Sequence, residues 1–454
     1  MEKMSLSEIV SAVGGSFGYP ADALIGSIST DTRKITAGSV FIALKGDNFD
    51  GHDFAPDAMK LGAEAVITER QIDGAKCIIV DSTVKALQEL AHYYRMKFDI
   101  PLVGITGSVG KTTTKDMIYC VLARKFKTLK TQGNHNNEVG MPQTLLELDS
   151  SYEAAVIEMG MNHVGEMSRL STCSAPTLCV ITNIGVSHIE NLGSQENILK
   201  AKLEILDGAA PDAPLVLNRD DKLLAGIDLR GTREAIYYSL KKKDCGIYAS
   251  NIVPEDGKIS FTINYNGSKY PAVINVLGEH NVRNALAAFT VGVSVGIDPA
   301  ECAAGVADYR PEGLRQNIRK VKGAAFVVDC YNAAPDSMRA ALSVLSQVEV
   351  AEGGKRICVL ADMLELGKKA ASYHKQVGEY VASAKADMLL CFGENSVYYI
   401  EGAVRKGMPR EACMHFDSRG ELSAYLSGCL KEGDAVLFKG SRGMKLEEVI
   451  ESLE

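Results

Sequence analysis

The sequence predicts a three-domain α/β protein, and three observations carry that prediction. The chain has 454 residues, whereas a single hydrophobic core rarely exceeds about 250–300 residues. Two series of short apolar runs alternate with helical patterns, which favours mostly parallel sheets built from βαβ units. Pro and Gly cluster between the two series, in YRPEG at 309–313. We therefore expect domains at 1–97, 98–310 and 311–454.

The first of these domains is predicted to be a small α/β unit. Short apolar runs mix there with turn residues, as in SISTDTRKITAGSVFIALKGDNFDGHDF. Such frequent turn residues between apolar runs are typical of short elements joined by several loops.

The central domain is predicted to be a mostly parallel sheet with helices on both faces. Near-continuous apolar runs suit strands that are buried on both sides. Beyond them, apolar and polar residues alternate on either side of Asn266-Gly267, which is typical of an antiparallel hairpin. A helix is expected over 281–295. Candidate parallel strands lie at 102–106, 154–159, 178–182 and 214–218.

The C-terminal domain is predicted to be a second α/β unit with a parallel, Rossmann-like sheet. Its apolar runs are again short and are separated by helical stretches. Candidate strands lie at 324–329, 356–362, 388–393 and 435–440.

Composition restricts the class of protein. Hydrophobic residues make up 46% of the chain and charged residues 23%, as in globular proteins. The formal net charge of -8 disfavours nucleic acid as a partner. The start, MEKMSLSEIV, lacks the features of a secretory signal, and no apolar stretch approaches the ~20 residues of a membrane helix. The eleven cysteines stand singly. We expect a cytoplasmic monomer with reduced thiols and no membrane insertion.

A glycine turn between the first central strand and a helix predicts a phosphate-binding loop. LVGIT is followed by GSVG and then by KTTTKDMIYCVL. The spelling departs from G-x-x-x-x-G-K-[ST], because Ile105 stands where the first Gly is required and Gly104 precedes it. Backbone N–H groups in such a turn face an anion, and the helix dipole adds to the attraction. Lys111 can reach the outer phosphates, and Thr112 can ligate Mg²⁺.

Three further side chains follow the central strands. Glu158 lies within an apolar run at the end of a strand, where a carboxylate can bind Mg²⁺. His188 follows another strand, on the side of an open sheet where ligands bind, and the residues alone leave structural and functional roles equally open. Lys202 lies in a helical pattern, and by itself it reads as a solvated position.

Taken together, these residues resemble the Mur ligase family, the ATP-dependent amide-forming enzymes of peptidoglycan assembly. The resemblance spans nearly the whole chain, and the form G-I-T-G-S-V-G-K-T-T is the family's own version of the loop. It rests on GNHNNEVGMPQTLL (133–146), VIEMGMNHVGEM (156–167), TNIGVSHIENLGSQENILKAKLEI (182–205), GEHNVRNALAA (278–288), DCYNAAPDSM (329–338) and VLFKGSRGMKLEEV (436–449).

The resemblance implies a role for each residue at a matching position. ATP would be held by Gly107, Ser108, Gly110, Lys111, Thr112, Thr113, Asn281, Asn284, Arg315 and Asp329. Mg²⁺ would be held by Thr112, Glu158, His188 and Lys202, and the catalytic set would be Lys111, Glu158, His188 and Lys202, with Lys202 as a carbamate. The substrates would be held by Ser29, Asp31, Arg33, Lys45, Gly46, Asp50, Gly51, His52, Asn134, Asn136, Asn137 and Asn332.

The implied reaction joins D-alanyl-D-alanine to UDP-N-acetylmuramoyl-tripeptide through an acyl phosphate. The first domain would bind the UDP-sugar, the central domain ATP, and the C-terminal domain the dipeptide. Two positions depart from the family pattern: Ala334 replaces Asn in Y-N-A-N-P, and Ala361 stands in place of Gly. His374 is a candidate base for the attacking amine, and a solvated position is an equal alternative.

Three other functions are compatible with parts of the sequence. Asn218-Arg219-Asp220-Asp221 approaches the N-K-x-D of a GTPase switch, although a polar turn after a strand explains it more simply. A non-catalytic nucleotide-binding scaffold would not need Lys111 together with Glu158 and Lys202. Another Mur-type or folate-type amino-acid ligase is the nearest alternative. Such an enzyme would add a single amino acid in place of the dipeptide.

Overall fold

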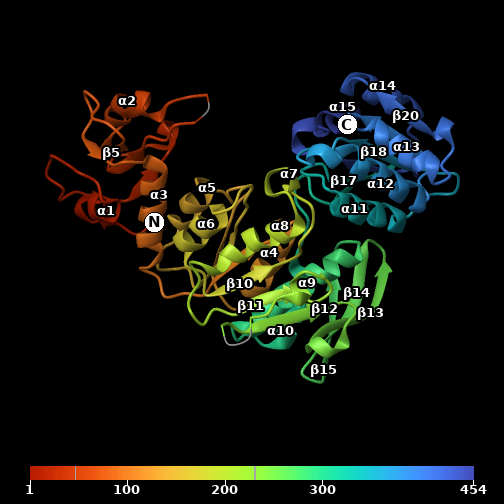
Figure 1. Ribbon diagram of the computed structural model, residues 1–454, viewed down its shortest axis with the longest axis horizontal. Coiled ribbons are helices and arrows are strands. Elements are labelled where there is room, and N and C mark those ends of the chain that lie inside the picture. Colours follow the sequence, from red (N-terminus) through yellow and green to blue (C-terminus); the bar gives the residue numbers. More distant parts are fainter. Residues whose placement is uncertain (47, 230–231) are drawn as a thin grey trace.

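The computed structural model describes residues 1–46, 48–229 and 232–454. Figure 1 shows three parts in chain order, with the N-terminal and C-terminal parts at opposite ends of the central one. Each part is built on its own mainly parallel sheet. The predicted three-domain α/β architecture is confirmed.

The N-terminal part contains a parallel sheet of order β3-β4-β5-β6 and a small antiparallel ribbon. A capping box starts its first helix, since Ser5 accepts from the Glu8 N–H and Glu8 accepts from the Ser5 N–H. The strands are β1 (Met4–Ser5), β2 (Leu24–Ile25), β3 (Ser27–Ser29), β4 (Ser39–Ile42), β5 (Ala63–Thr68) and β6 (Cys77–Ile79). The helices are α1 (Leu6–Ala12), α2 (Ala55–Lys60) and α3 (Thr83–Arg95).

The central sheet has the order β15-β14-β13-β12-β11-β10-β7-β9-β8, parallel from β8 to β13 and antiparallel beyond. Its strands are β7 (Leu102–Thr106), β8 (Thr128–Lys130), β9 (Ala154–Glu158), β10 (Leu178–Ile181), β11 (Leu215–Asn218), β12 (Ala235–Ser239), β13 (Ile247–Glu255), β14 (Lys258–Tyr265) and β15 (Ser268–Ile274). Its helices are α4 (Lys111–Leu122), α5 (Gly140–Leu145), α6 (Glu166–Ser174), α7 (Ile189–Leu192), α8 (Gln195–Leu203), α9 (Glu279–Ser294) and α10 (Pro299–Gly305).

The predicted central elements are present at their expected places, and three further strands lie among them. The hairpin turns at Asn266 and Gly267, whose positive φ values of 49° and 77° match a two-residue turn of the kind that closes hairpins. Strands β8, β12 and β13 were not predicted. Strand β8 has only three residues, too few for a periodic pattern to identify it.

The C-terminal sheet has the order β16-β17-β21-β18-β19-β20, with only its edge strand β16 antiparallel among the described strands. Its strands are β16 (Asn317–Val321), β17 (Ala324–Val328), β18 (Arg356–Ala361), β19 (Met388–Phe392), β20 (Cys413–Phe416) and β21 (Ala435–Lys439). Its helices are α11 (Pro335–Gln347), α12 (Ala370–Ser383), α13 (Val397–Arg405), α14 (Arg419–Cys429) and α15 (Glu447–Leu453).

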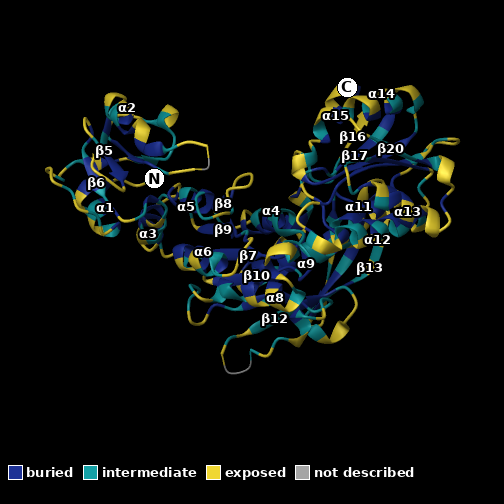
Figure 2. Ribbon diagram, turned by 45° about the horizontal axis from the view of Figure 1, so that its top comes forward, coloured by how far each residue is buried: buried dark blue, intermediate teal, exposed yellow. Residues whose placement is uncertain are grey.

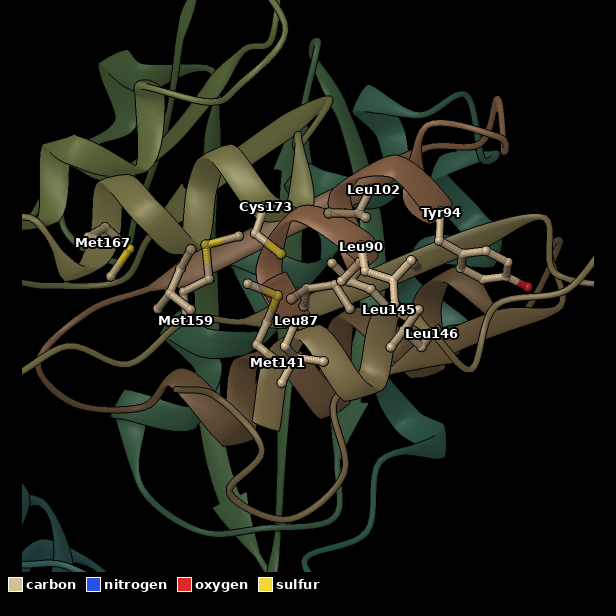
Figure 3. Close-up of a cluster of buried hydrophobic side chains, with 14 of the residues drawn as sticks. Leu87, Leu90, Tyr94, Leu102, Met141, Leu145, Leu146, Met159, Met167 and Cys173 are labelled. Carbon is tan, nitrogen blue, oxygen red and sulfur yellow. The ribbon is translucent and has the colours of Figure 1, made fainter. Parts of the chain in front are cut away.

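Helix α3 connects the first two parts through one continuous core. Leu87 and Leu90 of α3 belong to the same buried cluster as Met141 and Leu145 of α5 and Cys173 of α6 (Figure 3). Figure 2 shows the sheets as buried layers and the outer helix faces as exposed. The C-terminal sheet instead packs within two clusters that are mostly its own.

No described helix is long and apolar enough to cross a membrane. All eleven cysteines are free thiols, and eight of them are buried. Cys120, Cys245 and Cys429 are the partly exposed ones.

Candidate active site

The glycine turn predicted to bind phosphate joins β7 to α4. Gly110 has φ 83° and is the N-cap of α4, so it makes a left-handed bend that favours glycine. A Cβ on Gly107 would lie 1.9 Å from Thr182 Oγ1. Lys111 Nζ donates to the Gly107 carbonyl at 2.8 Å, which folds the side chain back over the loop. The turn therefore requires both glycines.

The end of the neighbouring strand β10 fixes the conformation of this loop. Asn183 Oδ1 accepts from the Val109 N–H at 2.9 Å, and Asn183 Nδ2 donates to the Val109 carbonyl at 2.7 Å. Thr182 Oγ1 donates to the same carbonyl at 2.8 Å. These two residues were not predicted, although they lie in the quoted stretch TNIGVSH. They fix the conformation of the loop through the backbone of Val109.

A cavity of about 480 Å³ opens above the loop, between the central and C-terminal parts. Most predicted residues of these two parts line it, whereas Gly107 and Lys202 are absent from its wall. The predicted lining residues are Ser108, Gly110, Lys111, Thr112, Thr113, Asn134, Asn136, Asn137, Glu158, His188, Asn281, Asn284, Arg315, Asp329 and Asn332.

Glu158 presents a carboxylate oxygen that has no hydrogen-bond partner in the described part of the chain. Its side chain is 1% exposed. Asn136 Nδ2 donates to Oε1 at 2.8 Å, and the backbone N–H donates to Thr131 Oγ1 at 2.9 Å, whereas Oε2 is buried and unpaired. A buried carboxylate oxygen of this kind is costly unless a cation or a donor reaches it. The position fits a divalent cation.

Lys202 is buried rather than solvated, which makes the expectation from its sequence pattern wrong. It is 2% exposed on α8, because that face of the helix packs into the central core. Burial, followed by the charge of Lys111, holds the pKa of Lys202 well below its ordinary value of 10.5. A neutral buried amine is the form that can add to CO₂, so the environment fits a carbamate.

His188 lies at the contact between the central and C-terminal parts. It is the N-cap of α7 and has φ 62°, a left-handed conformation that is uncommon for a non-glycine residue. Its Nδ1 lies 2.7 Å from Oε2 of Glu365, which follows β18, and this proximity lowers the pKa of Glu365. Glu365 also lines the cavity and was not predicted.

The donor set at this end of the cavity suits Mg²⁺ in chemistry. Thr112, Glu158 and His188 all line the cavity, and Oε2 of Glu158 has no hydrogen-bond partner among the residues that the structure describes. Carboxylate and hydroxyl oxygens are the ligands that Mg²⁺ prefers. Among the described residues, no three His, Cys, Asp or Glu side chains are gathered as a preformed metal cluster.

The C-terminal part contributes a second group of charged residues to the same cavity. Arg315 stacks on the ring of Tyr331, with the guanidinium carbon 3.9 Å from the ring centroid. Asp329 Oδ2 accepts from Lys439 Nζ at 2.7 Å, and Lys439 also donates to the Asn332 carbonyl at 3.0 Å. Lys439 is 2% exposed and lines the cavity. It was not predicted, although VLFKGSRGMK contains it.

Two asparagines of α9 face the loop from the other side. Asn284 Nδ2 donates to Asn281 Oδ1 at 3.1 Å, and Asn284 Oδ1 lies 3.1 Å from where a Cβ on Gly110 would stand. In the loop before α5, Asn137 Oδ1 accepts from the Gly140 N–H at 2.8 Å. Hydrogen bonds therefore hold the side chains of Asn137, Asn281 and Asn284 in place.

The residues predicted for the first domain are not among those that line the cavity. Asp31 accepts from Arg33 in a bidentate pair at 2.9 and 2.8 Å. His52 is 2% exposed, because its Nδ1 contacts Asp50 at 2.6 Å and its Nε2 accepts from the Glu69 N–H at 3.0 Å. The remaining members are Ser29 on β3, Lys45, Gly46 and Gly51, whose added Cβ would lie 2.4 Å from the Leu44 carbonyl.

Two alternatives from the sequence are now answered by geometry. Asp221 accepts from the backbone N–H groups of Ile184, Leu223 and Leu224, so it caps a turn. This supports the polar-turn interpretation over a guanine-binding motif.

His374 is neither solvated nor available as a base. It is fully buried, its Nδ1 lies 2.8 Å from the Ala370 carbonyl, and its Nε2 accepts from the Met363 N–H.

The two residues that depart from the family pattern, Ala334 and Ala361, are accommodated by Ser337 and Gly440 respectively. Ala334 precedes α11 without a side-chain cap, and Ser337 Oγ instead accepts from the Ala334 N–H at 3.0 Å. Ala361 is buried against Gly440, where an added Cβ would lie 2.7 Å from the Ala361 Cβ. The methyl group at 361 fits because the facing residue is glycine.

Comparison with known proteins assigns the class. The Mur ligase family catalytic domain matches residues 24–95, the Mur ligase middle domain matches 105–292, and the Mur ligase glutamate ligase domain matches 315–442. The chain belongs to the Mur ligase family.

Individual relatives show which type of Mur ligase the chain resembles. UDP-N-acetylmuramoyl-tripeptide–D-alanyl-D-alanine ligase of Bacillus subtilis is 37% identical over 100% of this chain and 99% of its own length. The ligase of the same name from Escherichia coli is 34% identical over 100% and 99%. A crystal structure of MurF from Acinetobacter baumannii matches with TM-score 0.92 and 29% identity over 100% and 99%, and the Thermotoga maritima MurF ligase in complex with ADP matches with 0.83 and 28% over 94% and 96%.

Proposed function

We propose that this chain is an ATP-dependent, ADP-forming ligase that joins D-alanyl-D-alanine to UDP-N-acetylmuramoyl-tripeptide. The setting would be the cytoplasmic synthesis of peptidoglycan precursors. One observation carries the proposal: the phosphate loop, the unpaired Glu158 carboxylate and the charged groups of the C-terminal part line a single cavity. Full-length relatives named for this reaction support it, and the ADP complex of one relative supports ATP as the co-substrate.

The chemistry activates a carboxylate, which is otherwise a poor acyl donor to an amine. The terminal carboxylate of the tripeptide attacks the γ-phosphorus of ATP, the bond to the bridging oxygen breaks, and ADP leaves. The amino group of D-alanyl-D-alanine then attacks the acyl carbon of the acyl phosphate, the C–O bond breaks, and phosphate departs as the amine loses a proton. One ATP is consumed for each amide bond formed.

Residues of this chain would stabilise the charge that moves during phosphoryl transfer. Lys111 and the N–H groups of the glycine turn surround the site of the outer phosphates. Arg315 reaches the same space from the C-terminal part. Burial is the main cause that lowers the pKa of Lys111, and the positive charge of Arg315 lowers it further. Asn281, Asn284 and Asp329 would hold the nucleoside. The buried position of His374 removes it as the amine's base.

Mg²⁺ would be held by Thr112, Glu158, His188 and a carbamate on Lys202. When bound, it would neutralise charge on the phosphate oxygens. This chain offers the metal a hydroxyl at the N-terminus of α4, an unpaired carboxylate oxygen of Glu158 and a buried amine of Lys202 whose pKa is lowered by burial.

The three regions 1–97, 98–310 and 311–454 would divide the work. The first would bind the UDP-sugar through the group that contains Arg33, Lys45 and His52, the second would bind ATP, and the third would bind the dipeptide near Asn332. Asn134, Asn136 and Asn137 line the cavity beside Glu158, where the reacting carboxylate would lie.

A product assay by mass spectrometry tests the proposal. The protein is incubated with ATP and D-alanyl-D-alanine, together with UDP-N-acetylmuramoyl-tripeptide carrying either lysine or diaminopimelate. We expect a UDP-pentapeptide and stoichiometric ADP only when both peptide substrates are present. Continued ADP formation beyond one equivalent per protein molecule without the dipeptide, or a product carrying one added amino acid, would contradict the proposed reaction.

A further inference from the structure

Gln316 lies in the connection between the central and C-terminal parts and is held in an unusual backbone conformation. It immediately precedes β16, and its φ of 48° is left-handed, which is uncommon for a residue with a side chain. Such conformations persist where the surrounding contacts hold them. The side chain of Gln316 supplies contacts of this kind.

The Gln316 amide joins two consecutive residues of α9. Its Oε1 accepts from Asn281 Nδ2 at 2.7 Å, and its Nε2 lies 2.6 Å from His280 Nε2. Burial lowers the pKa of His280 to about 4, so the ring is neutral near pH 7 and Nε2 can accept from the amide. Each end of the amide thus has a partner on the central part, while the backbone leads into the C-terminal sheet.

The contact continues from Asn281 toward the phosphate loop. Asn281 Nδ2 also donates to the Leu277 carbonyl at 2.7 Å, and its Oδ1 accepts from Asn284. Asn284 in turn faces Gly110 of the loop. On the other side, Arg315 is the chain neighbour of Gln316 and lines the cavity. Gln316 therefore stands between the residues of two parts that would hold the nucleotide.

We propose that Gln316 is a positioning residue for the nucleotide. Its amide would fix Asn281 and Asn284 against the glycine turn and would tie that geometry to the placement of Arg315. The inference rests on the proposed function for its kinetic test, whereas a binding measurement tests it independently. Gln316 is assigned no contact with the nucleotide itself.

The test compares three single variants of the full chain. Gln316→Met keeps the length of the side chain and removes both hydrogen bonds. Gln316→Glu keeps an acceptor for Asn281 and loses the donor to His280. Glu312→Gln, at an exposed position in the same connection, is the matched control. The Kd for ADP is measured by calorimetry, and KM for ATP and kcat are measured in the product assay.

For Gln316→Met we expect about a 10-fold rise in the Kd for ADP and in KM for ATP, with a smaller change in kcat. Gln316→Glu should recover part of this loss, because Asn281 keeps its acceptor. Glu312→Gln should match the unchanged protein. A merely structural role would lower the thermal midpoint without separating KM from kcat.

An unchanged Kd for ADP in folded Gln316→Met would overturn the inference. If Gln316→Met does not fold, Gln316→Glu decides: a Kd equal to that of the unchanged protein at both pH 6 and pH 8 overturns the inference, and a weaker one supports it. If the unchanged protein binds ADP but makes no UDP-pentapeptide, the proposed function fails and the binding comparison still tests Gln316.

Discussion

Replacing Lys202 with alanine tests the most unusual group of the candidate site. The side chain is 2% exposed, and both burial and the charge of Lys111 lower its pKa well below 10.5. The lowered pKa favours the neutral amine, which is the form that adds to CO₂, and a carbamate would place a negative charge near Lys111. Alanine removes that charge together with the amine.

The size of the effect follows from the loss of a buried charged partner. Removing one preorganised group that stabilises charge in the transition state costs roughly 3–4 kcal/mol. At about 1.36 kcal/mol per tenfold change in rate, kcat should fall by about 10²–10³-fold. Short carboxylic acids should restore part of the activity, since they supply a carboxylate to the vacated space. Lys200→Ala is the matched control, because Lys200 is exposed on the same helix.

Two measurements complete this test. Product formation is followed for both variants with and without acetate, and the unchanged protein is examined by NMR after exposure to labelled bicarbonate. We expect a carbamate resonance that is absent from Lys202→Ala. Undiminished turnover in Lys202→Ala, or no carbamate resonance from an active unchanged protein, would refute the reasoning.

The lowered pKa also has a consequence for stability. An amine whose pKa is lowered on folding binds fewer protons in the folded state than in the unfolded state below pH 10.5. The resulting cost is present at neutral pH and disappears as the pH rises toward 10.5. In CO₂-free buffer, Lys202→Met should therefore raise the free energy of unfolding at pH 7, and the gain should shrink as the pH increases. A gain that grows with pH in urea titrations would contradict this.

Three further predictions concern other parts of the site. Glu158→Gln keeps the acceptor for its neighbour and removes the charge, so Mg²⁺-dependent nucleotide binding should weaken by at least about 10-fold in calorimetry; an unchanged Mg²⁺ dependence would count against a metal ligand. Gly107→Ala would place a Cβ 1.9 Å from Thr182 Oγ1, and it should abolish ADP binding, whereas tight binding would show that the loop can rearrange. Lys439→Met leaves Asp329 without its 2.7 Å partner and should cost about 3 kcal/mol in urea unfolding, with no loss expected only if the pair is not formed.

Much of the fold was predictable because its signals are local. The strand 102–106 and the turn after it are recognisable from a short apolar run followed by glycines, and Asn266-Gly267 specifies a hairpin by itself. Strand β12 (Ala235–Ser239) was not predicted, because its pairing with β11 rather than a sequence pattern defines it.

The candidate site was predictable only where a residue belongs to a recognisable stretch. Lys202 looks solvated in its helical pattern, and only the packing of α8 on the sheet buries it. Gln316 and Lys439 were missed for a related reason: their partners Asn281 and Asp329 lie far away in the chain. Such pairs become visible only when the sheets that carry them are placed together.

Helix α3 makes the N-terminal part inseparable from the central one. One of its faces completes the core of the first sheet, while Leu87 and Leu90 pack against the helices α5 and α6. A protein truncated before Leu102 would leave Met141 and Leu145 uncovered, and the exposed apolar surface would favour aggregation. Denaturant should accordingly melt the first two sheets in one transition, whereas the third sheet, with cores mostly of its own, is free to melt at a different concentration.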